Sequence, residues 1–324
     1  MFDKKLAPGL AALAIGVTVL LGGCAAPQRP HETARARAIL EIRAHDPRPA
    51  VRADALEAMQ SLPAARIRNT IEQALHDPSP MVRFTALMIA GRDRLKTLEP
   101  RIRQMLAHDK NGSVRVAAVY ALRRMGDSSG MSLLARALSN PNPIVRANAA
   151  FVLGRLGDPS AIPLLLSHNG ETDPGVKLAI TSALARLGDP HAVNMLIGLS
   201  LSKYAQDHMA ALTTCTTLKN PEAVNVLLSG LHDPLPESRL IAARGLGRRG
   251  SRRGEKIALH YAHSRQPQLR ALAALALGAM PGKRQESVLA RLLHDHNKSV
   301  QVAAAAGLLD WQRHGRILAR RRGE

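Results

Sequence analysis

Residues 140–159 read NPNPIVRANAAFVLGRLGDP, and this stretch decides the fold of the chain. Pro is favoured at the first position of a helix, so the Asn-Pro turn suits a helix start. Apolar residues follow at helical spacing from Ile144 to Leu156, and Gly157 can end the helix in a left-handed conformation. Asp158 is a good N-cap, with Pro159 at the first position of a second helix. The stretch therefore predicts one helix that ends at Gly157 and another that begins directly after it.

The dipeptide Val145-Arg146 recurs along the chain with a period of 31 residues and a single step of 32. A leucine column on the apolar face repeats in the same register from Leu122 to Leu308 and holds Cys215 in one copy. Nine copies at one period predict a solenoid. The nine dipeptides are Val51-Arg52, Val82-Arg83, Val114-Arg115, Val145-Arg146, Val176-Lys177, Asp207-His208, Ser238-Arg239, Leu269-Arg270 and Val300-Gln301.

A helical pair of this length cannot bury its apolar stripe alone and needs a neighbour on both sides. We therefore predict an all-α fold, an α-solenoid or superhelix of about nine helical hairpins over residues 34–314, shaped as an elongated rod. Aromatic residues make up only 2% of the chain, which argues against a row of base-stacking rings. Two cysteines are too few for a disulfide framework, and Cys215 is predicted to be a buried free thiol.

The first 23 residues are typical of an export signal rather than of a folded segment. The apolar stretch from Leu6 to Leu21 follows two lysines and is too short for a comfortable membrane span. It ends in Leu21-Gly22-Gly23-Cys24, which resembles a bacterial lipobox, in which the cysteine is acylated. The resemblance implies a lipoprotein signal peptide over residues 1–23 and a lipidated tether over residues 24–33.

A chain of this kind would be anchored to a membrane of the cell envelope through acylated Cys24 and would face the periplasm. Acyl chains such as palmitate contribute roughly 0.8 kcal/mol per buried CH₂, so several chains hold a protein on a bilayer. Ala25 follows the cysteine in place of an aspartate. By resemblance to enteric lipoprotein sorting, this slightly favours the outer over the inner membrane.

One motif carries a family resemblance. The pattern Asp-Pro-x-x-x-Val-Arg-x-x-Ala followed by Leu-Gly-Asp-Pro stands here as Asn140-Pro141 with Val145-Arg146 and Ala149, then Leu156-Gly157-Asp158-Pro159. The chain thereby resembles the HEAT-repeat family, in the short bacterial form known from phycobilisome-lyase-type repeats, over residues 34–314. The resemblance implies that the second helix of each unit lines the concave side and carries a protein partner. It says little about function, because this repeat serves scaffolds, adaptors and a few enzymes.

Acids precede the arginine column by six residues in four copies: Asp46 with Arg52, Asp77 with Arg83, Asp109 with Arg115, and Asp233 with Arg239. The helix dipole disfavours Arg at a helix N-terminus, so a loop carboxylate beside each one is reasonable. The HEAT family carries a similar Asp–Arg ladder, which implies a structural ladder that also includes Arg146. The alternative is ligand binding, which we expect first at Arg270, because Ser264 stands where the acid would be.

Histidines recur one residue before the acid column. Equivalent residues of neighbouring copies lie roughly 8–10 Å apart, whereas two imidazoles on one zinc need Zn–N distances of about 2.0–2.1 Å. The row is therefore not expected to bind metal, and we predict neither a metal site nor a cofactor. Its members are His45, His76, His108, His232, His263 and His294.

The net charge of +20 is concentrated towards the two ends of the chain. Residues 24–125 hold 18 Lys and Arg against 10 Asp and Glu, residues 126–236 hold 7 against 8, and residues 237–324 hold 18 against 6. Residues 315–324 form a basic C-terminal tail. The basic ends are either a solvated face or a contact with an anionic envelope component, to which each basic residue near the surface adds about 1 kcal/mol. The candidate binding residues are Arg244, Arg248, Arg249, Arg252, Arg253 and Arg270.

The sequence holds no GxSxG, HExxH or glycine-rich phosphate loop. We therefore predict no catalytic residues and a non-catalytic, envelope-anchored scaffold or adaptor that binds a protein partner on its concave surface. Nucleic acid would suit the charge, but the export signal argues against it. The alternative is a HEAT-like enzyme with an unrecognised site, either a bilin lyase or a metal oxygenase resembling deoxyhypusine hydroxylase. That oxygenase uses repeated His-Glu pairs, whereas this chain has only His31-Glu32, in the expected tether.

Overall fold

The computed structural model describes residues 30–168, 170–202, 204–218, 220–280 and 282–322. Over this part the chain is all-α, and its eighteen α-helices pair into nine hairpins, so the predicted α-solenoid is confirmed. The first helices of the hairpins are α1 (Pro30–Arg43), α3 (Ala64–Ala74), α5 (Glu99–His108), α7 (Met131–Leu138), α9 (Ile162–Leu166), α11 (Pro190–Leu199), α13 (Pro221–Gly230), α15 (Glu255–Tyr261) and α17 (Lys283–Leu292). The second helices are α2 (Pro49–Ala58), α4 (Pro80–Arg92), α6 (Gly112–Met125), α8 (Pro143–Leu156), α10 (Pro174–Leu187), α12 (Ala205–Cys215), α14 (Pro236–Gly247), α16 (Pro267–Gly278) and α18 (Lys298–Arg322).

Several helix ends follow the sequence signals that predicted them, but the helix expected to start at Pro159 begins at Ile162, after a 3₁₀ turn over Pro159–Ala161. At the start of α8 the Asn142 side chain accepts a hydrogen bond from the backbone N–H of Ile144 at 2.9 Å, which satisfies a free donor of the first turn. The helix ends at Gly157, whose φ of 73° lies in the left-handed region that glycine adopts without strain. Gly126 and Gly188 end their helices in the same way.

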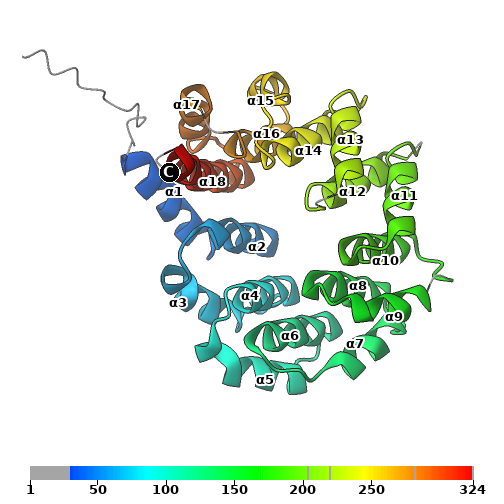
Figure 1. Ribbon diagram of the computed structural model, residues 1–324. Coiled ribbons are helices and arrows are strands. Elements are labelled where there is room, and N and C mark those ends of the chain that lie inside the picture. Colours follow the sequence, from blue (N-terminus) through cyan, green and yellow to red (C-terminus); the bar gives the residue numbers. More distant parts are fainter. Residues whose placement is uncertain (1–29, 169, 203, 219, 281, 323–324) are drawn as a thin grey trace, which may run out of the picture.

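The hairpins stand side by side around a ring, with the second helices in the inner layer and the first helices outside (Figure 1). Neighbouring inner helices meet through small residues. A Cβ built on Gly154 of α8 would lie only 2.7 Å from Cα of Ala183 in α10. Because the inner helices pack more closely than the outer ones, each hairpin is rotated against the previous one and the solenoid curves.

The last hairpin packs against the first and closes the ring. Helix α18 contacts both α1 and α2 (Figure 1). At this seam Lys298 Nζ lies 3.1 Å from a carboxylate oxygen of Asp46, and Arg43 donates a hydrogen bond to the side chain of Gln301 at 2.8 Å. The expected elongated rod is therefore wrong, because the curvature accumulated over nine hairpins brings the two ends into contact.

A further seam contact joins the Ser61 hydroxyl, which donates, to the carboxylate of Asp310. Closure also changes the meaning of the charge distribution. The two basic segments at the ends of the sequence become neighbours in space, and the near-neutral segment 126–236 lies on the opposite side (Figure 1).

The outer boundaries of the repeat array differ slightly from the expected ones. Helix α1 begins at Pro30, inside the stretch expected to be tether, and α18 continues to Arg322, through most of the expected tail. The signal peptide and Cys24 lie outside the described residues. Among the described residues, every helix is too short or too polar to span a lipid bilayer.

Candidate functional site

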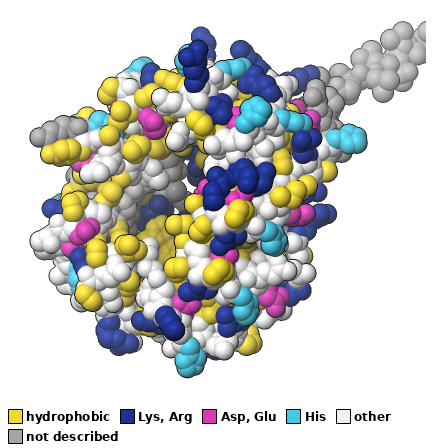
Figure 2. Space-filling view, turned by 180° about the vertical axis from the view of Figure 1, so that it is seen from behind, with side chains coloured by type: hydrophobic (Ala, Val, Ile, Leu, Met, Phe, Trp, Pro, Cys, Tyr) yellow, Lys and Arg dark blue, Asp and Glu magenta, His cyan; other side chains and the backbone are white. Residues whose placement is uncertain are grey.

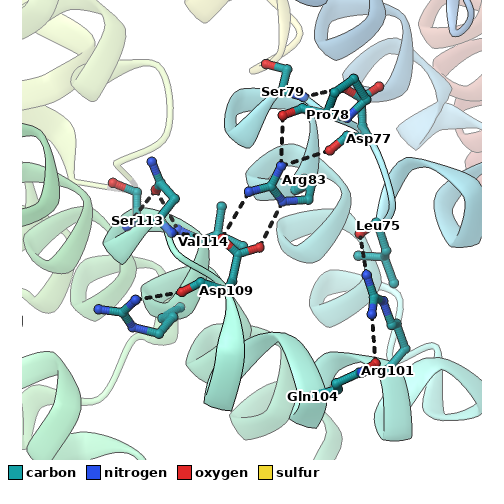
Figure 3. A network of polar contacts seen from close by, with 12 residues as sticks. Leu75, Asp77, Pro78, Ser79, Arg83, Arg101, Gln104, Asp109, Ser113 and Val114 are labelled. Atoms are coloured by element: carbon teal, nitrogen blue, oxygen red, sulfur yellow. Dashed lines mark hydrogen bonds and ion pairs between the residues drawn. The ribbon is translucent and has the colours of Figure 1, made fainter.

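The Arg–Asp ladder lies at the N-terminal ends of the inner helices and joins several of the hairpins to the next one. Arg83 shows the pattern in Figure 3: its guanidinium donates two hydrogen bonds to the carboxylate of Asp109, in the following hairpin, at 2.9 and 3.0 Å. Another bond goes to the backbone carbonyl of Asp77 at 2.8 Å. The predicted pairing of Arg83 with the Asp77 carboxylate is therefore wrong. That carboxylate instead accepts from Arg52 of the preceding hairpin, at 2.7 and 2.8 Å.

The same bidentate ion pair, in which one guanidinium donates to both oxygens of a carboxylate, recurs around the ring. It joins Arg52 to Asp77, Arg146 to Glu171, and Arg270 to Asp295, each with a closest N–O distance of 2.7 Å. In the sixth hairpin His208 takes the place of arginine and lies 2.7 Å from Asp233. Pairs of this geometry are stronger than single surface ion pairs because each guanidinium makes several charge-assisted hydrogen bonds.

Two ladder arginines have no carboxylate at the equivalent position of the next hairpin, where Asn140 and Ser264 stand. Arg115 keeps the bond to the backbone carbonyl of the acid six residues earlier, at 2.6 Å. Arg239 donates to the hydroxyl of Tyr261 at 2.5 Å, with its guanidinium carbon 5.3 Å from the centre of that ring. The ladder therefore varies in strength around the ring.

Arg270 was expected to be the ladder residue most available to a ligand. Its guanidinium instead donates to both carboxylate oxygens of Asp295, at 2.7 and 2.8 Å, and to the backbone carbonyl of Ser264 at 2.9 Å. The premise that Arg270 lacks an acid is wrong, because its acid comes from the hairpin that follows.

The ladder carboxylates that pair with arginine have a lowered pKa and are held in their charged form. Hydrogen bonds from Arg146 lower the pKa of Glu171 to about 2. Burial alone would raise the pKa of Asp109, but hydrogen bonds from Arg83 and from the backbone N–H of Asn111 bring it below its usual range. At neutral pH these arginine–carboxylate pairs are thus fixed ion pairs and are not suited to exchanging protons.

A cavity of about 610 Å³ lies inside the ring beside the seam, and we call it the inner cavity. Residues of α2, α4, α14, α16 and α18 line it, so it exists only because the ring is closed. Two candidate binding residues, Arg244 and Arg248, line it together with Glu57 and Asp310. Burial and the charge of Arg248 lower the pKa of Arg244 to about 10, although Glu57 and Asp310 act in the opposite direction.

The other candidate arginines of this run are placed differently. The Arg249 guanidinium donates hydrogen bonds to backbone carbonyls at the end of α12, among them that of Cys215 at 2.7 Å. Arg252 pairs with Glu255 at 2.8 Å, and Arg253 is exposed. The run that reads as one basic patch therefore divides between the inner cavity, a helix end and the solvent.

Large apolar side chains are exposed on the inner helices, including Ile144, which the sequence pattern counts among the apolar residues of its helix. Met81 of α4 and Ile144 of α8 are 55% and 66% exposed, and Phe151 of α8 is 39% exposed. Met81 and Ile144 hold equivalent positions, directly before the ladder valine. The equivalent residue of α18, Ser299, lines the inner cavity, so this column faces the inside of the ring. Figure 2 shows hydrophobic and basic side chains around the central hollow of one face.

Cys215 is a buried free thiol, as predicted, and burial raises its pKa to about 11. Among the described residues no three His, Cys, Asp or Glu side chains are grouped as a metal ion would require.

The repeat itself identifies the family. A model of HEAT repeats matches residues 36–123, 70–141 and 130–213, which together span more than half of the chain. The chain belongs to the HEAT-repeat family. The inner and outer layers of the ring are therefore the two helices of successive HEAT repeats.

This HEAT-repeat chain is similar to several solved structures at low identity. Human deoxyhypusine hydroxylase in complex with glycerol is 18% identical, over 88% of this chain and 98% of that one, with a TM-score of 0.40. The complex of CpcE and CpcF of phycocyanin lyase from Nostoc is 18% identical, over 74% and 94%, with a TM-score of 0.39. An engineered protein is 19% identical, over 56% and 95%, with a TM-score of 0.33. No curated protein matches the chain.

Proposed function

We propose that this HEAT-repeat ring is a non-catalytic scaffold of the bacterial cell envelope that holds a protein partner on its inner face. The observation that carries the proposal is the inner column that exposes Met81 and Ile144, with Phe151 further along α8. Exposed apolar side chains bordered by polar residues are typical of protein–protein contacts. Solenoids of stacked repeats use their concave side as an extended binding surface.

Membrane attachment through acylated Cys24 is part of the same proposal. The attached ring would face the periplasm, at the outer rather than the inner membrane. The lipobox motif supports it, and only a short segment separates Cys24 from α1, which begins at Pro30. The ring would therefore stay close to the lipid surface. Its two basic segments meet at the seam, where they would also suit an anionic envelope component.

Photo-crosslinking in the cell envelope tests the inner-face proposal. A photoreactive amino acid is placed at Phe151, on inner helix α8, and in a matched variant at Met195, which is 47% exposed on outer helix α11. We expect a discrete crosslinked protein from position 151 and none from position 195. Equal crosslinking at both positions, or none at position 151, contradicts the proposal.

The enzyme alternative is tested on the same purified protein. A scaffold binds no stoichiometric metal and turns over no substrate. Metal analysis that finds bound iron, together with hydroxylation or chromophore attachment in an activity assay, would replace the scaffold proposal.

A further inference from the structure

A second cavity, of about 700 Å³, is lined by residues of the fourth to seventh hairpins, and we call it the rim cavity. Its walls come from the C-terminal ends of α8 and α10, from α11, from Thr217 and Leu218 after α12, and from the start of α13 with Asn220 and Glu222. It lies at the opposite ends of the inner helices from the Arg–Asp ladder. Cavities of roughly 300–1,000 Å³ are the size that proteins use for small-molecule ligands.

Two arginines, Arg155 of α8 and Arg186 of α10, line the rim cavity from equivalent positions of adjacent hairpins. Equivalent residues of packed helices are roughly 8–10 Å apart, a distance over which long side chains can converge on one group. The close approach at Gly154, next to Arg155, holds the two helices together. The two guanidiniums therefore act on the same small volume.

Neither guanidinium has an acidic partner among the described residues. Burial lowers the pKa of Arg186, and the charge of the exposed Arg155 lowers it further, so the two like charges lie close enough to interact. Glu222 is the one carboxylate among the described lining residues, and it accepts a hydrogen bond from the amide of Asn220 at 3.0 Å.

Two other arginines in the same column have acids nearby. Arg92 donates to the adjacent carboxylate of Asp93 at 2.7 Å, and Arg248 faces Glu57 and Asp310 across the inner cavity. Arg124 of α6, in the same column, also has no acidic partner among the described residues, but it does not line the rim cavity. A guanidinium presents a planar fork of donors that matches the oxygens of a carboxylate or phosphate, and an anion between two of them would remove their repulsion.

We propose that the rim cavity binds the oxyanion group of a small ligand, a phosphate or a carboxylate, between Arg155 and Arg186. The exposed amide of Asn194 on α11 lines the same cavity and can donate to a further ligand oxygen. This site is separate from the inner column that carries the scaffold proposal, so either can fail without the other.

Isothermal titration calorimetry on the purified full chain, at constant ionic strength, tests the site with inorganic phosphate and with succinate as probes. We expect saturable binding of at least one probe. Arg155→Gln and Arg186→Gln should each weaken it by about tenfold or more, the loss of one charge-assisted contact. Arg186→Lys should retain part of the affinity. The control is Arg136→Gln, an exposed residue of outer helix α7, which should bind as the unchanged chain does.

Urea unfolding without ligand distinguishes a ligand-binding role of the two arginines from a purely structural one. The proposal expects Arg186→Gln to unfold at the same or a higher urea concentration, since a desolvated like charge is removed. The proposal is overturned if Arg186→Gln has a lower urea midpoint than the unchanged chain and the unchanged chain binds neither probe. Binding of both probes that is unaffected by the two Gln variants also overturns it. So does arginine-dependent sedimentation with phosphatidylglycerol vesicles when neither small probe binds, because the ligand would then be a lipid surface.

Discussion

Arg249 replaces a glycine cap at the end of one helix. A column of glycines closes the inner helices at Gly126, Gly157 and Gly188, but the sequence has Lys219 at the next position. The carbonyls at the end of α12 accept hydrogen bonds from Arg249 of the following hairpin instead, including that of Thr216 at 3.1 Å. The side chain thereby satisfies helix-end acceptors that would otherwise have to find other donors.

Replacing Arg249 by Met should lower the free energy of unfolding by about 2–3 kcal/mol, because several backbone carbonyls lose a charged donor. Arg253→Met, in the same basic run, should change it by less than about 0.5 kcal/mol, since Arg253 is exposed. Urea unfolding of the two variants checks this. Equal midpoints for both would show that Arg249 is not a helix cap.

The sequence alone could not separate Arg249 from its neighbours. Arg248, Arg249, Arg252 and Arg253 read as one basic run, and only the fold shows that the acceptors for Arg249 lie more than thirty residues earlier, as at Cys215. Arg248 reaches the inner cavity because the ring closes opposite it. Charge type is visible in a sequence, whereas the partners of a charge depend on how hairpins stack.

At the scale of the helices, the ladder is the main link between consecutive hairpins apart from apolar packing. Periodicity could not reveal which hairpin supplies the acid for each arginine, because an acid six residues before one ladder residue is also 25 or 26 residues after the previous one. The copies that lack the preceding acid could have revealed it. Arg146 and Arg270 follow Asn140 and Ser264, which are neutral, yet each has an acid 25 residues later.

Arg270→Gln should lower the free energy of unfolding by about 2–3 kcal/mol, because it breaks the paired hydrogen bonds to Asp295 and leaves that half-buried carboxylate without its cation. Arg265→Gln, exposed in the adjacent loop, is the control and should have little effect. Urea unfolding followed by circular dichroism measures both. An unfolding curve of Arg270→Gln that matches the control would contradict a structural role and return Arg270 to the ligand candidates.

At the scale of the whole molecule, helices, their caps and the hairpin number could be predicted because each is encoded within one period. Closure could not, because it depends on a small rotation per hairpin that is summed over nine of them. The inner cavity forms because the ring closes, so it could not be predicted from the sequence either. Its walls join Glu57 of the first hairpin to Asp310 of the last.

The seam should respond to acid through Asp46, which is only 3% exposed. Burial acts to raise its pKa, but hydrogen bonds from Arg48 and Lys298 bring it to about 2, below the ordinary value of 3.8. A lowered pKa means that the stabilisation is present above about pH 4 and is lost as the pH falls towards 2. The difference in stability between the unchanged chain and Asp46→Asn should therefore shrink over this range.

Thermal unfolding at pH 7, 4 and 2.5 measures this difference. At pH 7 the Asn variant should be less stable by about 2 kcal/mol, and Glu41→Gln, an exposed residue of α1, serves as the control. A gap between the unchanged chain and Asp46→Asn that stays constant from pH 7 to pH 2.5 would mean that the charged form of Asp46 does not hold the seam.

Ring closure is tested most directly by crosslinking across the seam. Ser61→Cys and Asp310→Cys are introduced together, since the two side chains are in contact, and the folded chain is treated with a short bifunctional maleimide. The control pair is Ser61→Cys with Thr217→Cys, the equivalent position on the sixth hairpin. A closed ring predicts rapid crosslinking within one chain for the seam pair and none for the control. Failure of the seam pair to crosslink within one chain, while both cysteines still react with a monofunctional maleimide, would contradict the closed ring.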